Sequence, residues 1–128
     1  MKKFLAVLCA LALAPVALFA GDFPDISIAE LKKAIAEKKV VVIDVNGSES
    51  YKSGHVPTAL DYSKISGGIS SSLPADKSTL IVAYCGGPSC NAYTRAANEA
   101  AKLGYTNVKH LSAGISGWKR SGSEVAKK

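Results

Sequence analysis

The sequence has few of the residues that hold metal ions or cross-link small domains. Its 128 residues include three cysteines and two histidines, scattered except for Cys85 and Cys90. A zinc site needs about four such ligands grouped together, so we expect no metal and no cofactor. A disulfide framework is also excluded, because two cysteines five residues apart restrain almost none of the chain. Their closeness indicates chemistry rather than scaffolding.

The sequence also lacks an apolar run of the length that a membrane span requires. The longest run extends from Phe4 to Phe19 and contains Pro15, whereas a spanning helix needs about 20 residues. Two lysines precede this run and the small Ala20 follows it, which is the pattern of a cleaved secretory signal. We therefore predict a signal peptide at residues 1–20 and a mature domain at residues 21–128, periplasmic or secreted and free of the membrane after cleavage. An uncleaved anchor is the alternative.

Positive charge is present but is not organised as a nucleic-acid site. The net charge is +6, and it falls to +4 without the two lysines of the predicted signal. Much of this charge lies in two lysine clusters, within residues 32–39 and at 127–128. Such clusters are typical of a solvated helix face and a chain end, so we expect no nucleic-acid partner.

What the sequence does contain is an alternation of amphipathic and β-branched segments. Ser27 and Glu30 form a capping box that predicts a helix start, and Gly104 is a typical residue just after a helix end. The pattern predicts helices at 28–39, at about 91–103 and at 114–120. It predicts strands at 40–45, 79–84 and 108–111, with a short strand at 59–62 as one option. Residues 67–72 are predicted to form a flexible polar connection.

This alternation predicts a single domain of the α/β class. Strands that alternate with helices form a parallel sheet covered by helices on both faces. Ligand sites of such sheets lie beyond the carboxyl ends of the strands. Cys85 directly follows the predicted strand at 79–84 and therefore lies at such an end.

Cys85 opens a short loop whose composition favours a reactive sulfur. Gly86 and Gly87 allow the backbone to turn its amides inward, and the helix expected from about residue 91 directs free N–H groups at the loop. Both effects favour the thiolate, which is the nucleophilic form of cysteine. The alternative is a buried cysteine that merely ends a strand. We predict Cys85 as the nucleophile and the following residues as the substrate-binding loop: Gly86, Gly87, Pro88, Ser89 and Cys90.

Four other polar or aromatic residues have structural explanations. Asp44 ends a strand, where we expect it to accept hydrogen bonds from backbone amides. His55 precedes Val56 and is interpreted as a packed histidine, and Trp118 is expected to anchor the last helix on the core. His110 lies within a strand and is free to face solvent.

Several segments of the chain match one known family in their order. They are Val42-Ile43-Asp44-Val45; Tyr51 with Gly54-His55-Val56-Pro57-Thr58-Ala59; Tyr84-Cys85-Gly86-Gly87-Pro88-Ser89-Cys90 with Ala96-Ala97 and residues 103–108; and Leu111, Gly114 and Trp118. Together they span about residues 28–119 and resemble rhodanese domains, which are sulfurtransferases. The resemblance implies the three-layer rhodanese-like fold, a persulfide-forming cysteine at Cys85 and a substrate cradle at residues 86–90.

The sequence departs from the family pattern at charged positions. Asn46 and Ser50 stand where the family usually has an Arg and a Glu, and the loss of both leaves no unpaired charge. In the loop, Pro88 has no N–H to donate, and Cys90 occupies a position where Arg is common. A thiosulfate dianion would therefore meet no cationic side chain there. A polysulfide or persulfide donor suits this loop better.

We therefore expect an exported single-domain sulfurtransferase. Cys85 takes sulfane sulfur from a small sulfur-containing donor and passes it to a thiol or cyanide-like acceptor, with a protein acceptor as a further option. Two alternatives remain open. One is a sulfur-binding or delivery protein with poor turnover, and the other is a thiol–disulfide switch that uses Cys85 and Cys90.

The two sulfurs of this loop are expected to be separate in the resting protein. A Cys90 that opens the following helix would point its side chain away from Cys85, and a disulfide requires close, facing Cβ atoms. We expect Cys90 to act only under oxidation, when it attacks a sulfenic or persulfide form of Cys85, in the latter case releasing sulfide.

Overall fold

The computed structural model describes residues 23–128, so the predicted signal peptide at residues 1–20 lies outside the described part of the chain. Among the helices of residues 23–128, none has the length and apolar character that a membrane crossing requires. The elements follow one another as α1 (Ile28–Ala36), β1 (Val40–Asp44), α2 (Ser48–Ser53), β2 (Leu60–Asp61), α3 (Tyr62–Ile65), a 3₁₀ helix η1 (Ile69–Ser72), β3 (Leu80–Tyr84), α4 (Thr94–Lys102), β4 (Val108–His110) and α5 (Gly114–Arg120).

The four strands form one parallel sheet in the order β2-β1-β3-β4. The two central strands pair along their whole length, from Val40 opposite Leu80 to Asp44 opposite Tyr84. Both strands are apolar on both faces, which is typical of a parallel strand between two helical layers. The predicted parallel α/β sheet is thus confirmed, and the carboxyl ends of its strands share one edge.

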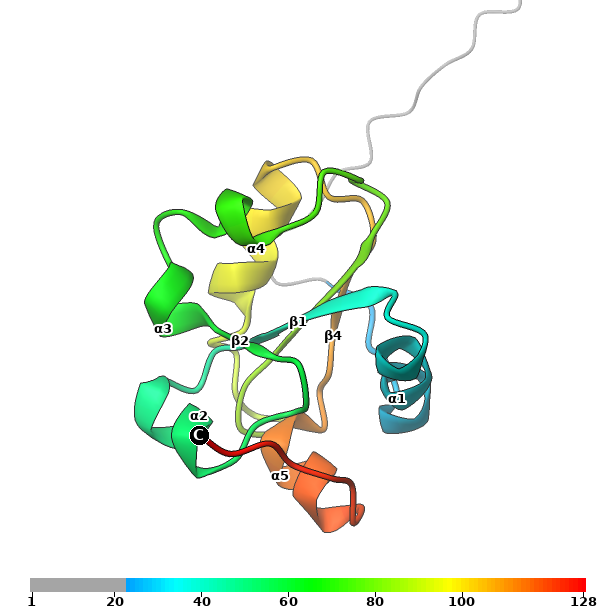
Figure 1. Ribbon diagram of the computed structural model, residues 1–128, viewed down its shortest axis with the longest axis vertical. Helices are drawn as coiled ribbons and strands as arrows, with labels where there is room; N and C mark the ends of the chain where they lie inside the picture. Colours follow the sequence, from blue (N-terminus) through cyan, green and yellow to red (C-terminus); the bar gives the residue numbers. More distant parts are fainter. Residues whose placement is uncertain (1–22) are drawn as a thin grey trace, which may run out of the picture.

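Helices cover both faces of the sheet and give the domain three layers (Figure 1). On one face α4, α3 and η1 enclose a core that includes Ile43, Ile81 and Ala97. On the other face α1 and α5 enclose a second core, in which Leu31 and Trp118 are fully buried. Successive residues of a strand point to opposite faces, so each central strand contributes to both cores.

The serine half of the predicted capping box is present at the start of α1. The Ser27 hydroxyl oxygen accepts a hydrogen bond from the Glu30 N–H and donates one to the Glu30 carboxylate. This cap satisfies one of the helix's free N–H groups and fixes its first residue. The helix ends at Ala36, three residues before the expected end, because Lys38 takes a positive φ of 56° and leads directly into β1.

Two predicted elements differ from the structure. The helix after the cysteine loop begins at Thr94 instead of about residue 91, because the Asn91 carbonyl accepts hydrogen bonds from both the N–H and the hydroxyl of Thr94 and closes a turn first. The connection at 67–72 is partly helical, since η1 turns Ile69 into the core.

The remaining structural expectations have mixed outcomes. His55 is buried and its ring stacks on Tyr51, as expected of a packed histidine. Trp118 anchors α5, and its indole N–H donates to the Glu124 carbonyl. The expectation that His110 is free to face solvent is wrong, because the ring is buried and stacks on Tyr93 at 3.4 Å between centroids.

A buried hydrogen-bond network ties the ends of the central strands to the neighbouring loop. The Tyr84 hydroxyl donates to the Asp44 carboxylate at 2.5 Å and accepts from the Val56 N–H at 3.0 Å. The other carboxylate oxygen of Asp44 accepts from the Asn46 N–H at 2.8 Å. Asp44 therefore accepts from a backbone amide, as predicted. Burial raises the pKa of Asp44, while the hydrogen bonds from Tyr84 and Asn46 oppose this rise.

We predict that Tyr84→Phe lowers the free energy of unfolding by roughly 3 kcal/mol, because it leaves one oxygen of the Asp44 carboxylate and the Val56 N–H without their buried partner. Chemical denaturation measures the loss. Tyr62→Phe is the matched control, because its hydroxyl donates to Glu99 in a part-buried position. The control should cost about 1 kcal/mol or less. Equal losses in the two variants would contradict the role given to the network.

Candidate functional site

The candidate nucleophile lies where the sequence placed it. Cys85 directly follows β3 at the carboxyl edge of the sheet, and it is only 1 % exposed. It packs in the same core as Val45, which directly follows β1, and Tyr93, which directly precedes α4. The loop after it returns toward the surface, with Pro88 and Ser89 exposed at its tip.

Backbone hydrogen bonds from helix α5 hold the first half of this loop. The Ile115 N–H donates to the Cys85 carbonyl and the Ser116 N–H donates to the Gly86 carbonyl, each at 3.0 Å. These two amides belong to the first turn of α5, where helix N–H groups have no partner within the helix. The loop therefore supplies the acceptors that the helix start lacks, and α5 fixes the two peptide groups that follow the candidate nucleophile.

The same two hydrogen bonds orient the amides of the loop. In a trans peptide the carbonyl and the following N–H point in opposite directions, and no cis peptide occurs among the described residues. Because the carbonyls of Cys85 and Gly86 face α5, the N–H groups of Gly86 and Gly87 face away from it. The predicted cradle is made of backbone N–H groups. These two N–H groups have the orientation that it requires, on the side of the loop opposite α5.

Gly114 allows the close approach of α5 to the loop. Its φ is +61°, and a Cβ atom built on it would lie 2.5 Å from the peptide between Gly86 and Gly87. Sequence reasoning missed the part that α5 plays, and treated Gly114 only as a helix start that matches the family pattern. The signal was present in that glycine, because a close backbone contact is one of the few reasons to require a residue without Cβ.

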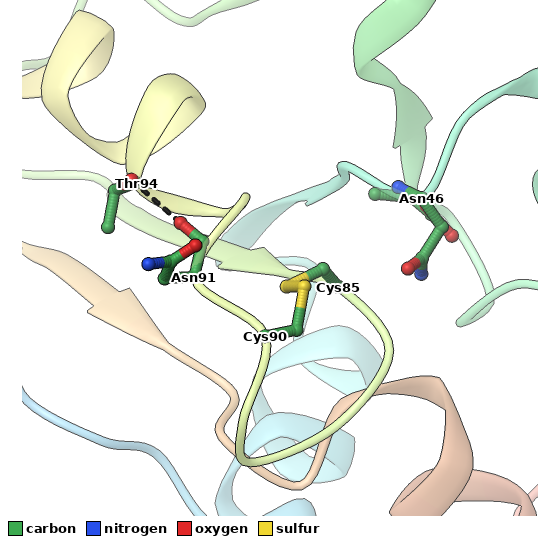
Figure 2. The surroundings of a disulfide bond; sticks show 6 residues. Asn46, Cys85, Cys90, Asn91 and Thr94 are labelled. Carbon is green, nitrogen blue, oxygen red and sulfur yellow. Dashed lines mark hydrogen bonds between the residues drawn. A yellow bond between two sulfur atoms is a disulfide. The ribbon is translucent and has the colours of Figure 1, made fainter.

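The expectation of two separate sulfurs is wrong. Cys85 and Cys90 form a disulfide, and their Cα atoms lie 6.3 Å apart. Figure 2 shows the bond closing the loop near its base. The prediction failed because it placed Cys90 at the start of α4. The helix begins four residues later, and a turn in which the Cys90 N–H donates to the Gly87 carbonyl at 3.1 Å returns Cys90 to Cys85.

No cationic side chain lies beside the loop at the position where the family usually has an Arg. Asn46 follows β1 and lies beside Gly86, on the other side of the loop from Asn91 and Thr94 (Figure 2). Its side-chain Nδ2 is buried and makes no hydrogen bond within residues 23–128, but it lies close enough to Asp44 to help lower the pKa of that carboxyl. The site is therefore polar and uncharged on this side.

His110 forms another part of the surroundings that the sequence did not reveal. It pairs with Ala83 across β3 and β4, and its ring covers Tyr93, which packs in the same core as Cys85. Burial lowers the pKa of His110, and the Asp25 carboxylate opposes this effect. A lowered pKa keeps the ring neutral at pH 7. It therefore contributes packing surface here and adds no positive charge to the site.

The predicted loop residues lie together at the carboxyl edge of the sheet. A hollow of about 860 Å³ occurs at the opposite edge of the sheet, beside the start of β1 and β3, and Lys38, Asp76 and Asn107 are among its lining residues. It contains neither cysteine nor histidine, so we assign no chemistry to it. Within residues 23–128 there is no group of three or more histidine, cysteine or acidic side chains arranged to hold a metal ion.

Residues 27–121 match the family described as the Rhodanese-like domain, which covers most of the chain. This chain belongs to the rhodanese-like domain family. The resemblance inferred from its motifs is thereby confirmed, and so is the α/β fold that it implied. None of the curated proteins is similar enough to this chain to count as a relative.

Solved structures of rhodanese-type domains share the fold. A Bacillus halodurans protein is 34% identical to this rhodanese-like domain, with a TM-score of 0.67, and the match covers 81% of this chain and 77% of that one. The human single domain sulfurtransferase is 20% identical, with a TM-score of 0.60 and coverages of 77% and 97%. A thiosulfate sulfurtransferase from Pseudomonas aeruginosa is 18% identical, with a TM-score of 0.66, and the match covers 82% of this chain and 20% of that longer one.

We predict that Gly114→Ala destabilises the protein by roughly 3 kcal/mol, because the new methyl group collides with the Gly86–Gly87 peptide at a positive φ. Thermal or chemical denaturation measures this loss. Gly68→Ala is the control, since its φ is −160° and nothing lies within 4 Å of the position that a Cβ atom would take there. That variant should change stability by less than about 0.5 kcal/mol. A tolerated Gly114→Ala would refute the close contact between α5 and the loop.

Proposed function

We propose that this protein is an exported sulfurtransferase that forms a persulfide on Cys85 and passes the sulfane sulfur to a thiophilic acceptor. The observation that carries the proposal is the position of Cys85, directly after β3 at the carboxyl edge of the sheet, in a chain of the rhodanese-like domain family. The Cys85 backbone is held by α5, and the N–H groups of Gly86 and Gly87 face away from that helix. Such amides stabilise either a thiolate or the terminal sulfur of a persulfide.

The proposed donor is a polysulfide or a low-molecular-weight persulfide in preference to thiosulfate. Residues 85–90 contain no charged side chain, and Asn46 replaces the family's usual Arg beside the loop. Pro88 removes one amide from the loop, so a dianion has fewer donors to bind. A monoanionic or neutral donor loses less from these replacements, because it has less charge to neutralise.

The proposed acceptors are a small thiol, a cyanide-like nucleophile or the cysteine of a partner protein. Export is proposed from the apolar N-terminal segment, and a periplasmic or secreted location would expose the protein to such sulfur compounds outside the cytosol. A second function is favoured by one observation, which is the disulfide between Cys85 and Cys90. It supports a thiol–disulfide cycle at the same site.

We predict that polysulfide adds about 32 Da to the peptide containing Cys85, as one bound sulfur atom requires. The measurement uses reduced Cys90→Ser protein, in which Cys85 cannot form the disulfide, and mass spectrometry of its peptides. Cyanide should then release the sulfur as thiocyanate, and turnover with polysulfide should exceed turnover with thiosulfate by about tenfold, the effect of one missing charge-assisted hydrogen bond.

The control for this experiment is the double variant Cys85→Ser/Cys90→Ser, which keeps the rest of the loop. It should take up no sulfur on this peptide. Loading of the double variant to the same extent would show that Cys85 is not the acceptor. Loading of Cys85 without thiocyanate formation would indicate a sulfur-delivery protein that needs its own partner. Faster turnover with thiosulfate would contradict the proposed donor preference.

A further inference from the structure

The disulfide shows that the loop can bring the Cys90 sulfur to the Cys85 sulfur. The two Cα atoms are 6.3 Å apart, within the ordinary disulfide range. The turn at Gly87 that returns Cys90 to the base of the loop is closed by a backbone hydrogen bond and does not depend on the disulfide for its donor or acceptor. A reduced Cys90 thiol is therefore positioned next to whatever species Cys85 carries.

The two cysteines differ in their access to solvent. Cys85 is 1 % exposed and belongs to the core between the sheet and α4. Cys90 is only partly buried, and its neighbours Ser89 and Asn91 are exposed. An external thiol that attacks this disulfide therefore meets the Cys90 sulfur first. Attack at that sulfur expels Cys85 as the leaving thiolate, next to the amides that stabilise it.

We propose that Cys90 is a resolving cysteine that gives the protein a second activity, the dithiol-dependent reduction of persulfide sulfur to hydrogen sulfide. This activity rests on the proposed persulfide at Cys85. In the first step the Cys85 thiolate attacks the terminal sulfur of a persulfide RSSH. The bond within the donor breaks, RS⁻ leaves and takes up a proton, and Cys85 carries the sulfur as a persulfide.

In the second step the Cys90 thiolate attacks the inner sulfur, which is the Sγ of Cys85. The bond to the outer sulfur breaks, the Cys85–Cys90 disulfide forms, and HS⁻ leaves and is protonated. The two cysteine sulfurs are oxidised by two electrons in total, and the sulfane sulfur is reduced by two. The disulfide seen in the structure is the product of this step.

A dithiol reductant completes the cycle. One of its thiolates attacks the more accessible Cys90 sulfur and forms a mixed disulfide, and the Cys85 thiolate is released. The second thiol of the reductant then attacks its own sulfur in the mixed disulfide and frees Cys90. The net reaction converts RSSH and a dithiol to RSH, hydrogen sulfide and the oxidised reductant, so that atoms and electrons balance.

A single-turnover experiment separates this activity from sulfur loading. The wild type, Cys90→Ser and Cys85→Ser proteins are reduced, freed of reductant and mixed with one equivalent of glutathione persulfide. Released sulfide is measured with an electrode, and the protein mass is measured in acid-quenched samples. Cys85→Ser is the matched blank, because it retains one of the two loop cysteines, as Cys90→Ser does, and corrects for sulfide released by the donor itself. Thermal unfolding of the reduced proteins confirms that each is folded.

We expect the wild type to release about one equivalent of sulfide and to become about 2 Da lighter, as disulfide formation requires. Cys90→Ser should retain the added sulfur, about 32 Da, and release less than about a tenth as much sulfide. If both proteins load Cys85 and both keep the persulfide, the resolving role of Cys90 is wrong while the sulfurtransferase proposal stands. If neither protein loads Cys85, both proposals fail.

The order of attack by the reductant has its own readout. The oxidised wild-type protein is incubated briefly with reduced glutathione, quenched with acid and mapped by peptide mass. Both cysteines lie on one peptide, residues 78–95, so fragmentation of that peptide locates the glutathione. Glutathione should be found on Cys90, because Cys85 is buried in the oxidised structure. Glutathione on Cys85 instead would overturn the proposed direction of the exchange.

Discussion

The pairing of β1 with β3 is the constraint on which the site depends. Because Asp44 lies opposite Tyr84, the two strands end together. Cys85 is the residue directly after Tyr84. The hydrogen bonds among Asp44, Tyr84 and the Val56 amide hold this edge of the sheet to the loop that follows α2. The candidate nucleophile is therefore positioned by the most buried part of the fold.

Much of this arrangement was predictable because the determining patterns are local. Residues close together in the sequence determine three of its features: the β-branched runs that form β1 and β3, the Ser27 cap, and the bounds of α5. The hold of α5 on the Cys85 carbonyl was not predictable in this way, because the donor Ile115 is thirty residues away in the chain. The same reason applies to the ring of His110, whose burial depends on stacking against Tyr93.

The main error concerned the start of α4, and it shows how a small boundary shift changes the chemistry. A helix that begins at Cys90 would fix that side chain away from the loop. Thr94 begins the helix instead, so the residues from Pro88 to Tyr93 form turns in which Cys90 is directed back to Cys85. Glycine and proline patterns locate a turn reliably, but the exact residue at which helical hydrogen bonding begins depends on competing acceptors, here the Asn91 carbonyl.

The geometry also sets a competition between the two proposed fates of the bound sulfur. The outer sulfur of a Cys85 persulfide lies beyond the buried Sγ, where an acceptor can meet it, whereas Cys90 attacks the inner atom. An intramolecular thiol acts at an effective concentration far above that of a dilute acceptor. With Cys90 reduced, we therefore expect release of sulfide to outpace transfer unless a partner binds over the loop and places its own nucleophile at the outer sulfur. The exposed tip at Pro88 and Ser89 is the part of the loop that such a partner would contact first. Cys90 thus stands, as a proposed second nucleophile, where the family pattern has a cation.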